Sequence, residues 1–174
     1  MLSMNIRGEY VYLRDISFDD LEKILTWYSK VEHFKYATGR DMPVEISDLV
    51  SIYEESVKSE SEFFAGIYKK KDSEMIGIIK GKLEIQNKRK VFVRMVVIDQ
   101  QYQRKGYGRE TINLGLSYLK NCKNVSEAYL AVIEENVKGR CFWKALGFNM
   151  YIRKKKCVKI SNKQCNVIIM KKNL

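Results

Sequence analysis

The amino-acid sequence predicts a mixed α/β fold, a mostly antiparallel sheet of about seven strands with helices on both faces. Two observations carry this prediction. Short segments rich in β-branched and aromatic residues alternate with helical patterns in the order β-α-α-β-β-β-α-β-α-β-β. A strand–helix–strand unit spans Arg89 to Ile133, and such a unit needs local parallel pairing inside the otherwise antiparallel sheet.

The N-terminal third predicts one strand and two helices. Glu9–Asp15 alternates between apolar and polar residues, as a half-buried strand does. Ser17 is placed to cap a first helix, with Asp20 in the capping-box position. Val31–Glu45 is expected to be a loop that exposes His33, the single histidine. The apolar stripe of the first helix is Phe18, Leu21, Ile24, Leu25 and Tyr28, and that of the second, capped by Ser47, is Leu49, Val50, Tyr53 and Val57.

Three consecutive strands follow. Glu62–Lys69 and Met75–Ile85 are joined by a charged turn, which indicates an antiparallel pair. Arg89–Ile98 is apolar on both faces, as expected of a central strand that is covered on both sides. Arg94 interrupts this run, and it either meets a substrate carboxylate or pairs with a neighbour such as Glu84. The sequence favours the pair.

The C-terminal part predicts two more helices and three more strands. A helix starts after two glycines and ends near Asn121, and Gly147 stops the following helix in the C′ position. The expected segments are a strand at Ser126–Ile133, a helix at Asn136–Leu146, and two strands at Phe148–Lys159 and Cys165–Lys171 around a turn at Ser161–Gln164.

Length and composition indicate one domain over residues 1–174, since the chain is long enough for a proper core and has a single proline and no low-complexity run. No apolar run is long enough to cross a bilayer and no secretory leader is visible, so we expect a cytoplasmic protein without membrane contact. The four cysteines form no C-x-x-C pair, and we expect reduced, packed thiols and no metal site.

The formal net charge of +11 has two interpretations. Lysine and arginine could serve a polyanionic partner such as RNA or the ribosome. Alternatively they form a solvated basic surface. The second interpretation is favoured, because the sequence contains no aromatic-plus-basic module of a known nucleic-acid-binding fold.

The sharpest chemical signal is the turn Gln103-Arg-Lys-Gly106-Tyr-Gly108, which links the central strand to the next helix. The first backbone N–H groups of a helix have no intrahelical acceptor and can point together at one anion. Glycine lets that backbone approach a ligand closely. No G-K-[ST] follows and the third glycine of a dinucleotide fingerprint is missing, so the turn predicts a different diphosphate site.

The turn fits the pattern Q/R-x-x-G-x-G/A and resembles the acetyl-coenzyme A loop of the GNAT N-acetyltransferase superfamily. A second block, Asn136 to Phe148, is similar to that family's N-x-x-A-x-x-[LF]-Y-x-K-x-G-F element, with Asn136, Phe142, Gly147 and Phe148 in matching positions. The opening Tyr12-Leu-Arg14 with Trp27 resembles the branch that acetylates ribosomal-protein N-termini, which also contains spermidine and aminoglycoside acetyltransferases.

The resemblance implies acetyl-CoA as co-substrate and assigns residues to it. The end of the central strand would splay from its neighbour and hydrogen-bond the pantetheine arm through Val96, Val97 and Ile98. The pyrophosphate would be held by Gln103, Arg104, Lys105, Gly106, Tyr107, Gly108 and Arg109. Asn136 would bond the pantetheine region or simply cap its helix. Arg140 would reach a phosphate, and Trp143 would form a wall beside the cofactor.

The proton-handling residues of the family are not visible. The tyrosine that protonates the leaving sulfur corresponds to Trp143, whose indole cannot deliver a proton at neutral pH, and the glutamate base corresponds to Phe92. Glu134, Glu135 and Tyr129 are the remaining candidates for general acid–base catalysis. Deprotonation through water, with no essential base, is the alternative. Cys141 is interpreted as packing because no histidine pairs with it.

Two functions therefore remain open. The first is an N-acetyltransferase that acts on a primary amine, either a protein N-terminus or a small molecule, by direct attack on the thioester. The second is a catalytically weak acyl-CoA-binding module that acts through a basic face toward a ribosome, RNA or protein. The sequence does not decide between a monomer and a homodimer.

Overall fold

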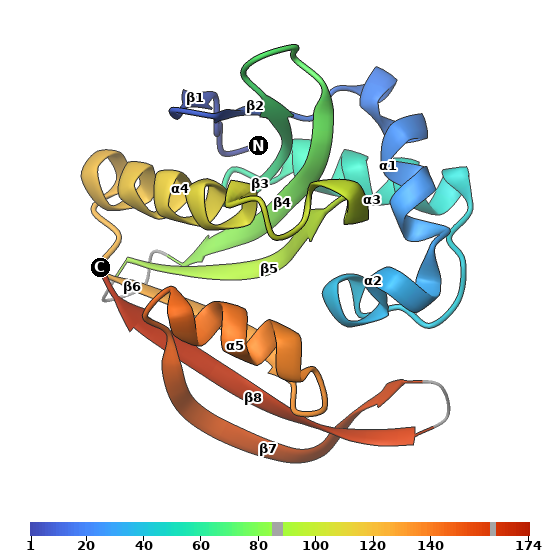
Figure 1. Ribbon diagram of the computed structural model, residues 1–174, viewed down its shortest axis with the longest axis vertical. Helices are drawn as coiled ribbons and strands as arrows, with labels where there is room; N and C mark the ends of the chain where they lie inside the picture. The colour runs from blue at the N-terminus through green and yellow to red at the C-terminus, as the bar shows by residue number, and fades with distance from the viewer. Residues whose placement is uncertain (85–88, 161–162) are drawn as a thin grey trace.

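The computed structural model describes residues 1–84, 89–160 and 163–174. Its described residues form one eight-stranded sheet in the order β1-β2-β3-β4-β5-β6-β8-β7 (Figure 1). All neighbours pair antiparallel except β5 and β6, which are parallel. The strands are β1 (Ile6–Arg7), β2 (Val11–Asp15), β3 (Glu62–Lys69), β4 (Met75–Glu84), β5 (Lys90–Ile98), β6 (Glu127–Ile133), β7 (Asn149–Ile160) and β8 (Lys163–Asn173).

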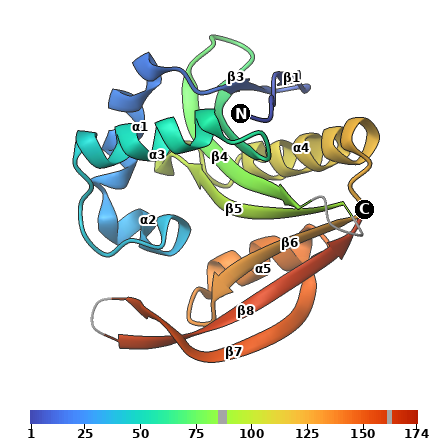
Figure 2. The ribbon, with the colours of Figure 1, turned by 180° about the vertical axis from the view of Figure 1, so that it is seen from behind.

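Helices cover both faces of the sheet. The helices α4 and α5 lie on one face, and α1 and α3 lie on the other, as the two opposite views show (Figures 1 and 2). The helices are α1 (Leu21–Tyr28), α2 (Val31–Thr38), α3 (Ile46–Lys58), α4 (Tyr107–Lys123) and α5 (Val137–Ala145), with short 3₁₀ turns η1 (Phe18–Asp20) and η2 (Gln100–Tyr102). The predicted mixed α/β fold is confirmed.

Three details differ from the sequence prediction. The two-residue strand β1 adds an eighth strand at the edge of β2. The segment expected to be a loop contains α2, whose only buried residue is Phe34 and whose N-terminus has no side-chain cap, so it lacked the usual sequence signals. Glu45 rather than Ser47 precedes α3. Ile85 of the expected second strand, and Ser161 and Asn162 of the expected last turn, lie outside the described residues.

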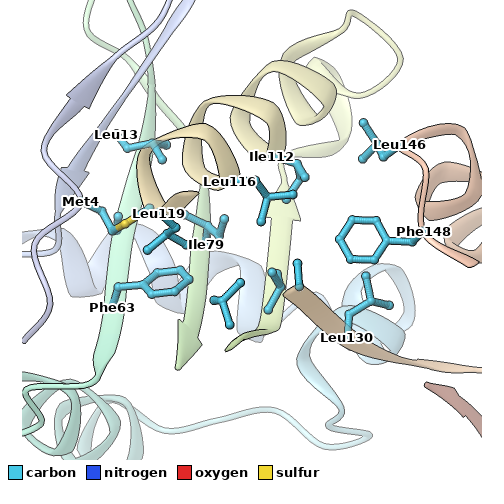
Figure 3. Close-up of a cluster of buried hydrophobic side chains, with 14 of the residues drawn as sticks. Met4, Leu13, Phe63, Ile79, Ile112, Leu116, Leu119, Leu130, Leu146 and Phe148 are labelled. Atoms are coloured by element: carbon cyan, nitrogen blue, oxygen red, sulfur yellow. The ribbon is translucent and has the colours of Figure 1, made fainter. Parts of the chain in front are cut away.

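The core has two layers because successive strand residues point to opposite faces. Phe63 joins the cluster under α4, whereas Phe64 joins the cluster under α1 and α3. On the inner face of α4, Ile112, Leu116 and Leu119 are all buried. These side chains lie against the sheet together with Met4, Leu13, Phe63, Ile79, Leu130, Leu146 and Phe148 (Figure 3).

The parallel pair β5–β6 is short. Its register runs only from Lys90 opposite Glu127 to Val93 opposite Leu130, although both strands continue beyond these residues. On its other side β5 carries an irregularity, because Lys80 pairs with Met95 and Gly81 with Val93, which leaves Arg94 as an extra residue. The strands therefore part from the middle of β5 onward, and Figure 2 shows them diverging toward α2.

The strand β7 forms the far edge of the sheet, and every residue in it except Ile160 is exposed. Its lysines account for part of the positive charge and lie on this solvated edge, where charged side chains discourage pairing with other chains. Three of the four cysteines, Cys122, Cys141 and Cys157, are exposed, and only Cys165 is buried. The expectation that the thiols are packed is therefore wrong for three of them.

Among the described residues, no helix is long and apolar enough to span a membrane.

Phe148 provides a test of the core. It is fully buried between α5 and the sheet, so Phe148→Ala should lower the free energy of unfolding by about 3–5 kcal/mol, since it removes a large side chain and leaves a cavity. Met150, two residues away, is 66% exposed, and Met150→Ala should change stability by less than about 0.5 kcal/mol. Urea unfolding of both variants measures the difference. Equal losses in the two would contradict the assignment of this core.

Candidate functional site

The parting strands open into a cavity of about 650 Å³. Five parts of the fold line it: β5, β6, the turn before α4, the start of α5, and α2. The lining residues are Tyr36, Ala37, Val93, Arg94, Met95, Val96, Ile98, Gln103, Arg104, Gly106, Gly108, Arg109, Leu130, Ala131, Val132, Asn136, Lys138, Gly139, Cys141, Phe142 and Trp143. Residues of both sequence motifs therefore meet in one cavity, although more than 25 residues separate Gly108 from Asn136 along the chain.

The glycine turn has the backbone of an anion site. Gly106 has φ +88° and precedes the first helical residue of α4, and Arg104 also has a left-handed φ of +59°. A Cβ built on Gly106 would meet nothing within 4 Å, so the space beside it is open to a ligand. The first amides of α4 have no intrahelical acceptor, and together with the helix dipole they favour a bound anion.

Hydrogen bonds fix the turn to the end of β5. The side-chain amide of Gln103 donates from Nε2 to the carbonyl oxygen of Ile98 at 2.9 Å. Asp99 accepts from the indole Nε1 of Trp27 at 2.8 Å and from the backbone N–H of Gln101 at 3.2 Å. Burial opposes ionisation of Asp99, but these two hydrogen bonds outweigh it and hold the pKa of its carboxyl below the usual range. The buried Trp27 thereby ties α1 to the turn.

The charged residues of the described cavity lining are all positive. Arg94, Arg104, Arg109 and Lys138 line it, and among residues 1–84, 89–160 and 163–174 no aspartate or glutamate belongs to its lining. Such a cavity attracts anions. A ligand with a diphosphate and an extended arm fits this arrangement, because the open glycine turn can receive the diphosphate and the gap between the strands can receive the arm.

The gap between β5 and β6 offers free backbone groups. Beyond Val93, the edge of β5 that faces β6 makes no ladder hydrogen bonds with it. Val96 and Ile98 line the cavity, as the sequence predicted for a strand that binds an extended ligand. The side chain of Val97 is buried in the cluster under α1 and α3, and its backbone pairs with Ile78 of β4, so Val97 offers no free group to the cavity.

Besides Val97, three predicted contacts are not on the cavity wall. The cavity lining does not include Lys105, Tyr107 or Arg140, although each is adjacent in sequence to residues that line the cavity. Tyr107 instead packs edge-on against Tyr102, with ring centroids 6.3 Å apart. The ammonium of Lys105 lies 5.5 Å from the centroid of the Tyr102 ring. Arg140 keeps its Nε buried, with no hydrogen-bond partner among the described residues.

Asn136 caps α5. Its side-chain Oδ1 accepts a hydrogen bond from the backbone N–H of Gly139 at 2.9 Å, which is the capping role that the sequence analysis considered. A Cβ on Gly139 would lie 2.4 Å from Nδ2 of Asn136, so glycine there makes room for the cap rather than for a ligand. Asn136 still lines the cavity, and its Nδ2 has no acceptor among the described residues.

Trp143 forms part of the cavity wall. Its indole packs edge-on against Phe142, with centroids 4.9 Å apart, and against Phe148, with centroids 5.3 Å apart. Indole offers no proton that could be transferred at neutral pH. The residue therefore shapes the cavity.

The three candidates for acid–base catalysis lie outside the cavity lining. Arg153 donates two hydrogen bonds of 2.7 Å to the carboxylate of Glu134 and Asn166 donates a third, which lowers the pKa of Glu134 to about 2. Glu135 lies 3.9 Å from Nζ of Lys163. These contacts argue against both carboxylates as bases.

Tyr129 is in the paired part of β6, opposite Phe92, and lines a separate small pocket. Its hydroxyl donates to the carboxylate of Glu127 at 2.8 Å. Burial, followed by this hydrogen bond, raises the pKa of Tyr129. The geometry therefore argues against Tyr129 as well.

Sequence reasoning missed Tyr36. It lies on α2, in the segment expected to be a loop, and it lines the cavity opposite the glycine turn. Cys141, expected to be packing, also lines the cavity and is exposed. These two are the lining side chains that carry an O–H or S–H proton. No sequence pattern pointed to Tyr36, because its role depends on where α2 docks.

Comparison with known proteins identifies the family. The model of the acetyltransferase (GNAT) domain matches residues 13–169. No curated protein matches the sequence. Among solved structures, spermidine N-acetyltransferase from Vibrio cholerae in complex with CoA and spermine is similar with a TM-score of 0.82 and 21% identity over 95% of this chain and 96% of that one.

Two further solved structures share the fold. An acetyltransferase from Salmonella typhimurium that modifies the N-terminal serine of a 50S ribosomal subunit protein has a TM-score of 0.83 and 11% identity, with 96% of both chains covered. Ribosomal-protein-S5-alanine acetyltransferase from Vibrio fischeri has a TM-score of 0.75 and 20% identity over 97% of this chain and 95% of that one. At these identities the structures support the fold, while the matched family model shows that this chain belongs to the GNAT acetyltransferase family.

Proposed function

We propose that the protein is an N-acetyltransferase that moves an acetyl group from acetyl-CoA to a primary amine. The observation that carries this proposal is the single cavity in which the parted strands β5 and β6 meet the glycine turn. Acetyl-CoA is the acetyl donor of this family. Its diphosphate and its extended arm match the two parts of the cavity.

Two parts of acetyl-CoA, its pyrophosphate and its pantetheine arm, contact different parts of the cavity. The backbone amides from Arg104 to Gly108 hold the pyrophosphate, since the N–H of Gln103 donates to the carbonyl oxygen of Gln100, and Arg104 and Arg109 supply positive charge. The pantetheine arm lies between the strands and bonds the backbone of Val96 and the N–H of Ile98 like an added strand, because the carbonyl of Ile98 accepts from Gln103 and the backbone of Val97 pairs with β4. Trp143 packs beside it. Asn136 contributes its free Nδ2, since its Oδ1 is used by the cap.

The proposed reaction requires few catalytic side chains. The neutral amine nitrogen attacks the thioester carbonyl, the carbon–sulfur bond breaks, and the thiolate takes up the proton that the amine loses. Free N–H groups at the parted edge of β5 stabilise the oxygen that gains charge. Before the attack the protonated amine must lose one proton, and because no carboxylate lines the cavity among the described residues, we assign this first deprotonation to water.

Thiol release from acetyl-CoA, measured against a panel of peptides and small amines, tests the function as a whole. Release that depends on an amine supports an acetyltransferase. Tight CoA binding without release for any amine would instead indicate an acyl-CoA-binding module, and failure to bind CoA would refute both.

Gly106 allows a test of the turn with a matched control. Gly106→Ala puts a Cβ on a residue with φ +88°, which is strained by about 1–2 kcal/mol and shifts the amides that hold the pyrophosphate. We expect CoA to bind about tenfold more weakly, or worse, by isothermal titration calorimetry. Gly39→Ala carries a similar strain at φ +68°, also with open space around it, but lies at the end of α2. Its CoA affinity should not change. Equal loss in both variants would contradict the assignment.

The pH profile tests how the proton leaves. An α-amino group has a pKa of about 8, so kcat/KM should rise about tenfold per pH unit below that value and level off above it, because only the neutral amine attacks. Glu134, with a pKa of about 2, stays ionised over the whole pH range of the assay and therefore adds no second slope to the pH profile.

The variants Glu134→Gln, Glu135→Gln and Tyr129→Phe should retain kcat/KM within about threefold, since a true general base contributes about 100-fold or more. Thiol-release kinetics from pH 5 to 9, at about 25 °C, provide the measurement. A loss of that larger size in a folded variant, with a changed profile, would identify that residue as the base.

A further inference from the structure

We propose that the acceptor amine carries a carboxylate close to its amino group, and that Arg94 on β5 binds this carboxylate. The inference rests on the proposed acetyltransferase function and names the class of acceptor. It follows from the position of Arg94, from the surplus of cations around it, and from the lack of carboxylates on the cavity wall.

Arg94 lies where the two strands part. It is the first residue of β5 beyond the last parallel pair, Val93 with Leu130, and it is also the extra residue in the pairing of β5 with β4. Arg94 is one of the residues that line the cavity, and its side chain is 43% exposed, so the guanidinium is open to solvent and to a solute. The β5 backbone that we assign to the pantetheine arm starts at Val96, two residues further along the strand, so we place a group bound by Arg94 near the thioester.

The guanidinium is oriented and only partly used. Nη1 donates to Oε1 of Glu62, on β3, at 2.7 Å. The sequence predicts an ion pair between Arg94 and a neighbour such as Glu84. In the structure the partner of Arg94 is Glu62. The other guanidinium nitrogens of Arg94 have no acceptor among the described residues. A planar guanidinium presents several donors in a fixed fork, so it can keep Glu62 and still receive a second carboxylate.

Positive charge exceeds negative charge around Glu62. Besides Arg94, Nζ of Lys80 lies 3.9 Å and Nζ of Lys82 4.0 Å from its carboxylate oxygens. Three cations thus share one carboxylate, with Glu55 of α3 near enough to act on Lys80. An anionic ligand group would complete this cluster, because a second negative charge reduces the repulsion among the cations.

The same charges disfavour a polycationic acceptor. Recognition of several ammonium groups requires carboxylates, and none lines this cavity. Of the other lining cations, Arg104 and Arg109 lie at the glycine turn and the start of α4, where the donor phosphates are assigned, and Lys138 lies on α5. Arg94 is the cation of the described lining that lies on β5, and we assign it to the acceptor.

The alternative is that Arg94 serves only the ion pair with Glu62. Two variants distinguish this alternative from carboxylate binding by Arg94. Both Arg94→Gln and Glu62→Gln break the same ion pair, but only Arg94→Gln removes the guanidinium. The probes are matched amines that differ in one charge: free amino acids against their carboxamides, and tripeptides with glutamate against glutamine in the second position. Spermidine serves as the polycation.

We expect the parent enzyme to use the carboxylate probes with a kcat/KM at least tenfold above that of their neutral partners and of spermidine. Arg94→Gln should lose this preference while its CoA affinity and thermal midpoint stay close to those of the parent. Glu62→Gln should keep the preference. Preference for the amino-acid pair identifies a small acceptor, and preference for the tripeptide pair identifies a peptide N-terminus.

The proposal is overturned if the parent prefers the neutral probes or spermidine, or if both variants lose the preference equally. Acetyl transfer to the neutral probes alone would refute this inference and leave the proposed function intact. Absence of thiol release with every amine would refute the proposed function, and this inference with it.

Discussion

The early end of the parallel pairing between β5 and β6 is the constraint on which the rest of the structure depends. Four residue pairs hold the strands together, and from Arg94 onward β5 does not pair with β6 in the part of the chain that the structure describes. Unpaired backbone inside a fold is costly unless something satisfies it. Here the open edge faces a cavity and leads directly to the glycine turn, so the same departure from regular pairing creates the space, the hydrogen-bonding groups and the approach to the helix dipole of α4.

The elements around this opening are fixed by contacts outside it. Trp27 and Asp99 connect α1 to the end of β5, and Gln103 closes the turn onto Ile98. The aromatic contact of Trp143 with Phe148 joins α5 to the core. These contacts use side chains that no substrate has to displace. The cavity is thus held in shape by the surrounding fold, as a site that binds an extended ligand through backbone groups requires.

The sequence predicted the donor half of the site better than the acceptor half. Backbone recognition of a diphosphate depends on local conformation, and local conformation is encoded by neighbouring residues such as Gly106 and Gly108. Proton handling and acceptor recognition depend on side chains brought together from distant segments. Glu134 and Glu135 were near the opening in sequence, but their carboxylates pair with Arg153 and Lys163. Tyr36 was missed because it reaches the cavity only through α2.

Apart from β1 and α2, the sequence by itself determined the order of strands and helices, the parallel unit at the centre and the turn that opens α4, since these follow from periodicity and glycine positions within short windows. Only the tertiary structure decided which side chains share the cavity, that Glu62 is the partner of Arg94, and that Oδ1 of Asn136 accepts the hydrogen bond that caps α5. These facts depend on strand register and helix docking, where a shift of one residue turns a side chain to the other face.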